Sequence, residues 1–427
     1  MVIDVAPLRA GKAFRLVFTT QAITMLGTNI TSVAASLQVY QLTGSSLQVG
    51  TVNLVLGLAL LVGLLTGGVL ADRVDRKRII VSTRAGVVLV LAGLAVNAAV
   101  PSPQLWFVYV AAVLAGGING LGGPALMAIT PTLVGPRHLA AAGALTALTT
   151  QFGAMLGPVL AGLIAAGPGL ALCFTVDAIS FVIGVVLLRG LPALPPGNQD
   201  SARTHPLRSM AEGLKFVRRN QVISGLLLID LWAMVFAMPY AVFPEFGTEH
   251  LGGGPSTVGL LYSAPAVGAF LGALTSGWTG RTRRTGYALI GAVLMWGLAI
   301  AGFGLSEQLW LALLFLATAG LGDTTSEILR RALLQHYTPD RLQGRVGSVW
   351  LAQATVSPAV GNAEVGLVSR LVSAPVAVVG GGLVCVLGVV VLALSLPKFR
   401  KASLRTPTAD ELVEPIGDRD QVEKTTS

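Results

Sequence analysis

The sequence predicts an all-α polytopic membrane protein with twelve transmembrane helices arranged as two six-helix halves. Of its 427 residues, 53% are hydrophobic and only 11% are charged, whereas about 25% of the residues of a soluble domain are charged. Apolar runs of about 20 residues, the length that crosses the hydrocarbon core, recur along the chain. The loops between these runs are alternately rich and poor in Lys and Arg. This composition suits a bilayer and not water.

The apolar runs define the expected spans in chain order. We place them at residues 15–38, 47–71, 80–99, 105–131, 140–166, 169–189, 221–246, 256–279, 287–305, 309–330, 346–371 and 376–396. The Pro-rich stretch from Leu191 to Asp200 cannot cross lipid, so it reads as a linker between spans six and seven. The expected organisation is therefore an N-terminal six-helix bundle (1–190), a cytoplasmic linker (191–220), a C-terminal six-helix bundle (221–397) and a disordered cytoplasmic tail (398–427).

The linker carries a second signal between His205 and Asn220. Apolar residues recur there at helical spacing with Arg and Lys around them, which predicts a helix lying on the membrane interface. An ordinary solvated linker is the alternative.

The net charge of the chain is +9, and the basic residues that produce it lie mainly in the loops and near the termini. Basic residues cluster near the amino terminus and in every second loop, and Arg370 alone breaks the alternation. This pattern places both termini in the cytoplasm of an inner-membrane protein, and it argues against nucleic acid as a partner.

The two halves repeat each other. Residues 49–68 can be laid on residues 258–277 without gaps, and a basic turn follows both copies. Parallel repeats of this kind are a transporter architecture in which the substrate site lies between the halves near the bilayer midplane.

Other classes of function lack their signatures. Cys173 and Cys385 lie inside apolar runs and the four histidines are scattered, so we expect no disulfide and no metal site. No phosphate-binding loop and no nucleophile with a base are recognisable, so we expect neither a cofactor nor an enzyme. A membrane enzyme or a receptor built on the same fold remains an alternative class.

The loop after span two carries the most specific motif. Gly68, Leu70 and Ala71 precede the acidic residue Asp72 and a run of Arg and Lys residues. This pattern resembles the loop signature of the major facilitator superfamily. The matching residues expected to form a cytoplasmic gate are Gly68, Asp72, Arg73, Arg76 and Lys77. Asp75 stands where the family has Gly, which puts the tight turn of the family in doubt. A merely basic loop would explain the cations but not the spacing.

Span five contains a second motif, formed by Gly153, Gly157, Pro158 and Gly162. It resembles the motif of proton-driven efflux carriers within the same superfamily, which implies export. Pro158 kinks the span and the small residues allow close helix packing, with Gly268 to Gly272 in span eight as the expected partner surface. A general Gly-rich packing face is the alternative.

Carboxylates inside spans are costly and therefore point to function. The candidates for proton coupling are Asp230, near the middle of span seven, Asp323 and Glu327, four residues apart in span ten, and Glu364. Two neighbouring carboxylates compete for ionisation, so one of the span-ten pair can bind and release a proton. A static ion pair with Arg330 or Arg331 is the alternative for Glu327, and Asp177 is read as structural. Candidates for the cavity wall are Gln21, Asn29, Gln151, Trp232, Tyr240 and Gln353.

Beyond the superfamily, the chain resembles the enterobactin exporters of enteric bacteria over residues 14–399. The stretches that carry this resemblance are residues 67–73, 130–135, 205–207, 272–277 and 344–353. The resemblance implies a monomeric, proton-coupled antiporter in the lipid bilayer that exports a siderophore by alternating access. The family has Arg where this chain has Gln21, and it lacks the Asp323 and Glu327 pair, so a multidrug or antibiotic efflux pump stays open as the alternative.

Overall fold

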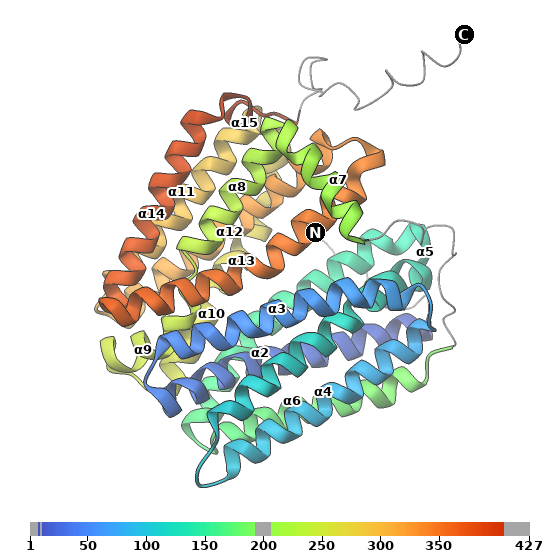
Figure 1. Ribbon diagram of the computed structural model, residues 1–427, viewed down its shortest axis with the longest axis vertical. Coiled ribbons are helices and arrows are strands. Elements are labelled where there is room, and N and C mark those ends of the chain that lie inside the picture. The colour runs from blue at the N-terminus through green and yellow to red at the C-terminus, as the bar shows by residue number, and fades with distance from the viewer. Residues whose placement is uncertain (1–6, 9–10, 193–205, 405–427) are drawn as a thin grey trace.

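The computed structural model describes residues 7–8, 11–192 and 206–404, and it confirms the all-α fold class: these residues form helices and no strand (Figure 1). The helices of the first half are α2 (Lys12–Thr43), α3 (Ser46–Ala71), α4 (Arg76–Ala99), α5 (Leu105–Ala166) and α6 (Leu170–Arg189).

The second half follows a connecting helix, α7 (Pro206–Arg219), whose position at the membrane interface stays a prediction. Its helices are α8 (Gln221–Phe236), α9 (Phe243–Glu245), α10 (Pro255–Leu274), α11 (Thr285–Gly304), α12 (Leu309–Tyr337), α13 (Gln343–Leu371), α14 (Ala374–Ser395) and α15 (Pro397–Arg400).

Within the described residues, ten helical stretches are long and apolar enough to cross a membrane. Helices α2 and α13, of 32 and 29 residues, pack in the same bundles but fall outside this set. Both carry amides and hydroxyls along their length, including Asn29 and Ser32 in α2 and Gln353 and Asn362 in α13. The chain is a multi-pass membrane protein, and the full count of twelve spans stays a prediction that depends on these two polar helices.

Helix α5 contains the boundary between the fourth and fifth expected spans. Gly135 has φ 69° and ψ 169°, which is not helical, and it divides α5 into Leu105–Gly135 and Arg137–Ala166. A residue with a side chain would be strained at this positive φ, so Gly135 allows the chain to leave the first helix and begin the second at little steric cost.

Span seven is broken, although its apolar pattern predicted one continuous span over residues 221–246. Helix α8 ends at Phe236, and the rest of the span is a 3-10 turn (Tyr240–Val242), α9 and a π-helix (Phe246–His250). The break exposes backbone groups that neighbouring side chains satisfy. The indole Nε1 of Trp296 donates to the carbonyl of Ala237 at 3.1 Å, and the amide of Ala241 donates to Oδ1 of Asn362 at 2.8 Å. Unwound backbone of this kind is tolerated in a membrane where protein or a cavity surrounds it.

The two halves meet along only part of their length (Figure 1). We call the region around the loops at residues 44–45, 167–169, 251–254 and 372–373 the closed end. There the backbones of α3 and α13 are in direct contact. A Cβ added at Gly50 would overlap the carbonyl oxygen of Asn362, and a Cβ added at Gly366 would overlap that of Ser46. Likewise a Cβ on Gly162 of α5 would lie 3.2 Å from the Cα of Gly259 in α10.

The halves separate at the opposite end, which we call the open end and which carries α7. A Cβ on Gly68 of α3 or Gly143 of α5 would meet no atom within 4 Å. A cavity of about 400 Å³ lies between α3, α7 and α13 at this end, with Arg341 and Arg345 in its wall. The two bundles therefore form a wedge, closed at one end and accessible from the other.

Candidate functional site

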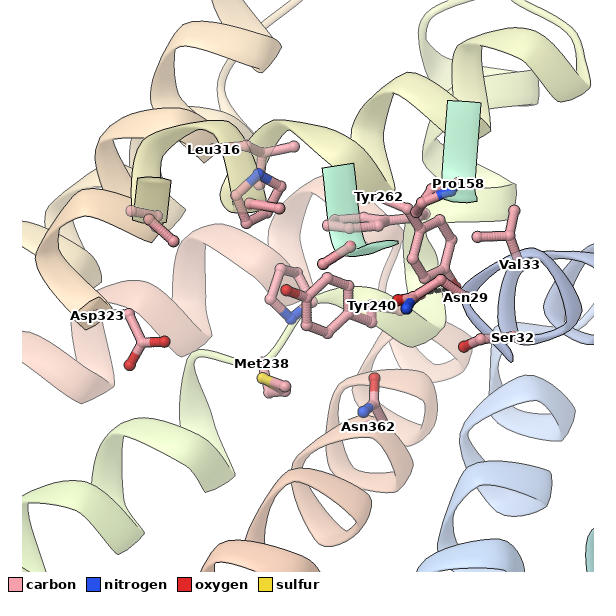
Figure 2. Close-up of a pocket in the computed structure, with 18 of the residues that line it drawn as sticks. Asn29, Ser32, Val33, Pro158, Met238, Tyr240, Tyr262, Leu316, Asp323 and Asn362 are labelled. Atoms are coloured by element: carbon pink, nitrogen blue, oxygen red, sulfur yellow. Dashed lines mark hydrogen bonds between the residues drawn. The ribbon is translucent and has the colours of Figure 1, made fainter. Parts of the chain in front are cut away.

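A central cavity of about 360 Å³ lies between the halves, near the middle of α2 and α12 (Figure 2). This volume lies in the range typical of small-molecule sites. Most of its polar lining residues are neutral amides and hydroxyls: Asn29, Ser32, Ser36, Asn53, Gln151, Tyr240, Tyr262 and Asn362. Asp323 is the only charged residue among the described residues that line it.

One wall of the cavity is aromatic, and the broken span supplies part of it. The rings of Tyr240 and Tyr262 stack with centroids 5.6 Å apart at an interplanar angle of 14°, and Phe243 meets both rings edge-on. The hydroxyl of Tyr262 donates to the backbone carbonyl of Tyr240 at 2.8 Å, which fixes this pair. Since stacked rings attract further rings, the wall can hold an aromatic molecule.

The carboxylate of Asp323 lies at the edge of the cavity (Figure 2) and has no hydrogen-bond or ion-pair partner among the described residues. Only its backbone carbonyl is engaged, as acceptor of the Ser326 hydroxyl at 2.8 Å. Inside a membrane protein an unpartnered carboxylate is costly, and it is stabilised by a proton or by a cation from the cavity.

Asp230 is placed differently. Its Oδ1 lies 2.9 Å from Nη1 of Arg330, and its Oδ2 accepts a hydrogen bond of 2.9 Å from Nε2 of Gln353. Asp230 and Arg330 are 3% and 5% exposed, and neither lines the central cavity. This pair, together with Gln353, therefore connects α8, α12 and α13 outside the cavity lining.

The other two candidate carboxylates also lie away from the cavity lining. Glu327 pairs with Arg331 at 2.5 Å, and both side chains are exposed. The guanidinium of Arg331 also lies 5.0 Å from the ring centroid of Trp350 in α13. Spacing correctly put Asp323 and Glu327 one turn apart, but only the first faces the cavity. Glu364 has no hydrogen bond among the described side chains.

Three of the six candidates for the cavity wall line it: Asn29, Gln151 and Tyr240. Gln353 holds Asp230 instead, and the indole of Trp232 donates to the carbonyl of Val384 at 3.0 Å beside α14. Gln21 is not among the described lining residues.

Several lining residues were not predicted from the sequence, including Ser32, Ser36, Asn53, Tyr262, Trp296 and Asn362. Asn53 and Tyr262 occupy equivalent positions of the internal repeat, with an offset of 209 residues. That repeat was a signal that could have found them.

The span-five motif serves two interfaces. Gly153 and Gly157 face α2, where a Cβ on Gly153 would lie 3.3 Å from backbone atoms of Met25. Gly162 instead faces Gly259 of α10, across the boundary between the halves. Span eight is the partner helix, and Phe270 of the expected segment packs against Phe152 of α5 with ring centroids 5.9 Å apart. The glycines of that segment, Gly268 and Gly272, instead face α12 of their own half.

The motif after α3 lies at the open end. Asp75, the departure from the family pattern, caps α4: its carboxylate accepts from the backbone amides of Lys77 at 2.8 Å and Arg78 at 3.4 Å. An Asp at this position satisfies the free amides of the helix start, so the turn forms without Gly. Asp72 is exposed, and its carboxylate has no partner in the described part of the chain. The gating role of this motif stays a prediction.

A buried charge also lies inside the first half. Asp177 is 1% exposed and accepts hydrogen bonds from the hydroxyls of Thr31 at 2.7 Å and Ser180 at 3.0 Å. These bonds join α2 to α6, which agrees with the structural role predicted for Asp177.

Comparison with known proteins identifies the fold. The sequence pattern of the Major Facilitator Superfamily matches residues 17–361 and residues 232–418. The chain belongs to the Major Facilitator Superfamily. It is therefore a membrane transporter, and the predicted resemblance to the superfamily is confirmed.

Individual relatives refine this placement. The chain is 33% identical over 413 residues to Enterobactin exporter EntS of Shigella boydii serotype 18, with 96% of this chain and 98% of the relative covered. It is 34% identical over 404 residues to Enterobactin exporter EntS of Citrobacter koseri, with 94% and 96% covered. The predicted resemblance to enterobactin exporters is thus confirmed.

Solved structures share the fold at low identity. A nucleoside transporter, NupG, gives a TM-score of 0.73 at 13% identity, covering 91% of this chain and all of that one. A bacterial homologue of the human lysosomal transporter Spinster gives 0.67 at 16% identity, covering 94% and 98%.

Proposed function

We propose that this chain is a proton-driven exporter of a small organic molecule that works by alternating access. The observation that carries the proposal is the unpartnered carboxylate of Asp323 in a cavity between two halves that are joined at one end and separated at the other. With the orientation predicted from the basic loops, the open end is cytoplasmic, so cargo enters the cavity from inside the cell.

The cycle we propose follows from this geometry. Cargo binds against the aromatic wall, the open end closes, and the closed end opens and releases the cargo outside. A proton from outside then binds Asp323 and neutralises it, which allows the halves to return, and the proton leaves to the cytoplasm. We revise the first choice of proton carrier from Asp230 to Asp323, because Arg330 already neutralises Asp230.

Asp323→Asn should uncouple transport from the proton gradient, because the amide cannot bind and release a proton. One net charge moved across about 100 mV is worth about 2.3 kcal/mol, so the steady-state accumulation of cargo should fall by up to about fiftyfold. The measurement is gradient-driven uptake into inverted vesicles beside cargo exchange without a gradient, and the exchange should persist.

Glu327→Gln is the matched control, since it removes a carboxylate one turn away whose ion-pair partner within the described residues is Arg331 alone. It should retain gradient-driven uptake. Full gradient-driven uptake by Asp323→Asn would refute the assignment.

A siderophore is the first candidate cargo. The relatives that share a third of their residues with this chain are enterobactin exporters, and the stacked tyrosines offer a surface for the aromatic rings of a catecholate.

A hydrophobic drug or an antibiotic is the second candidate, and the charge of the cavity favours it. No Lys or Arg is found among the described lining residues, and the only charge is the carboxylate of Asp323. Such a cavity attracts neutral or cationic molecules more readily than anions.

Deleting the gene in its host distinguishes the two candidates. If the cargo is a siderophore, the deletion should strongly lower the amount of secreted siderophore and leave drug susceptibility unchanged. Unchanged siderophore secretion with increased drug sensitivity would reject the first candidate and support the second. Complementation with the unaltered chain is the control.

A further inference from the structure

The broken span seven reaches across the closed end to the first half of the molecule. Two carboxylates make these contacts, Glu245 at the end of α9 and Glu249 in the π-helix. Oε2 of Glu245 accepts a hydrogen bond of 2.5 Å from the hydroxyl of Ser46, at the start of α3. Oε1 of Glu249 accepts a hydrogen bond from the hydroxyl of Tyr40, near the end of α2.

Glu245 also holds its own half. The same Oε2 atom accepts a hydrogen bond of 2.9 Å from the hydroxyl of Ser369, near the end of α13. Ser46 and Ser369 are 3% and 6% exposed, so this carboxylate joins two shielded donors from opposite halves. Hydrogen bonds to an ionised acceptor are roughly twice as strong as neutral ones.

The glycine contacts at the closed end differ from these polar contacts. The contact of Gly50 with Asn362 and of Gly366 with Ser46 is van der Waals packing between backbones. Such packing lets the halves approach but is weak for each atom pair. The bonds to Glu245 and Glu249 are directional and can be exchanged for water when the end opens. Packing therefore allows closure, and the two carboxylates fasten it.

The segment that carries both carboxylates is separate from α8. The helix stops at Phe236, and Pro239 follows before the segment Tyr240–His250 begins. Tyr240 and Phe243 of this segment also line the central cavity. One short segment thus contacts the cargo site at one end and the opposite half at the other.

We propose that Glu245 and Glu249 form a carboxylate latch that keeps the closed end shut. The segment Tyr240–His250 is its movable part, and the break at Ala237–Pro239 is its hinge. Cargo that displaces Tyr240 or Phe243 shifts the segment and weakens the latch, so filling of the cavity favours release to the outside. The latch requires neither proton coupling nor a particular cargo.

The test measures access to the cavity from outside. Ala154 lines the cavity, so Ala154→Cys is labelled by a membrane-impermeant maleimide only where the cavity is open to the reagent. The buried native residues Cys173 and Cys385 are replaced by Ala. In right-side-out vesicles of the full chain, Glu245→Gln and Glu249→Gln should each raise the labelling rate by roughly tenfold, equivalent to about 1.4 kcal/mol.

Glu307→Gln is the matched control, because Glu307 is an exposed carboxylate in the loop between α11 and α12 and has no bond to the described residues of the other half. It should label at the parent rate. Parent rates in both latch variants would overturn the proposal, as would an equal rise in Glu307→Gln.

Tyr40→Phe and Ser46→Ala provide a second arm, because each removes the hydroxyl that the first half donates to the latch and keeps the carboxylates. Both should raise labelling in the same direction, and unchanged rates in both would overturn the proposal even if a Glu variant fails to reach the membrane. Labelling in inverted vesicles should fall correspondingly. Since no gradient or cargo is used, failure of this test and failure of proton-driven export are distinguishable.

Discussion

Replacing Asp230 with Asn should lower the stability of the folded transporter by about 3 kcal/mol, near the lower end of the range for breaking a buried ion pair. The substitution leaves the guanidinium of Arg330 without its partner at 5% exposure, where water cannot replace the lost charge. Thermal unfolding of the purified protein in detergent measures the effect, with a thiol-reactive dye that reports exposure of the buried Cys173 and Cys385.

Two variants test the cause of this loss. Glu327→Gln breaks the exposed pair with Arg331, and exposed pairs are worth about 0–1 kcal/mol, so its unfolding temperature should stay near that of the parent. Asp230→Asn combined with Arg330→Gln removes both charges and should recover much of the lost stability. Equal stability of Asp230→Asn and Glu327→Gln would contradict the importance of the buried pair.

Replacing Gly162 with Leu should abolish most transport by preventing the closed end from forming. A Cβ at this position would lie 3.0 Å from the Cα of Ser256 and 3.2 Å from the Cα of Gly259 in the other half. Overpacking of this kind costs about 1–3 kcal/mol, which shifts the equilibrium between the two ends by about 5- to 150-fold. Cargo uptake into inverted vesicles measures the loss.

Gly143→Leu in the same helix is the matched control, since a Cβ there would meet no atom within 4 Å. It makes the same chemical change at the open end, where an added Cβ overlaps no atom, so the closed end should still form and most transport should be retained. Normal transport by Gly162→Leu would show that contact between α5 and α10 is not needed for the cycle.

The positions of the spans could be predicted from the sequence because the bilayer acts on each segment separately. Nearly every expected span overlaps a long helix in the structure, and the linker helix lies within the residues expected for it. The motif after span two and the resemblance to enterobactin exporters also needed only local residue patterns. The expected tail begins at residue 398, and its part from residue 405 lies outside the described residues.

Helix ends and breaks were less predictable. The break after Phe236 depends on Trp296 and Asn362, which satisfy the freed backbone groups from distant parts of the chain. Pro239 indicates that the helix can break there, because proline lacks a backbone amide hydrogen. The unwound segment is stable inside the membrane only because these partners form hydrogen bonds with its free backbone groups.

The sequence by itself determined that this protein is a polytopic transporter with two related halves, because hydrophobicity, loop charge and motif spacing are properties of each segment. Only the tertiary structure decided which carboxylate faces the cavity. Asp230, Asp323 and Glu327 are all acidic residues in apolar helices. Their roles diverge because Asp230 is held by Arg330 and Gln353, Glu327 pairs with Arg331, and the carboxylate of Asp323 has no hydrogen-bond or ion-pair partner among the described residues. Such partnerships depend on how helices from distant parts of the chain pack together.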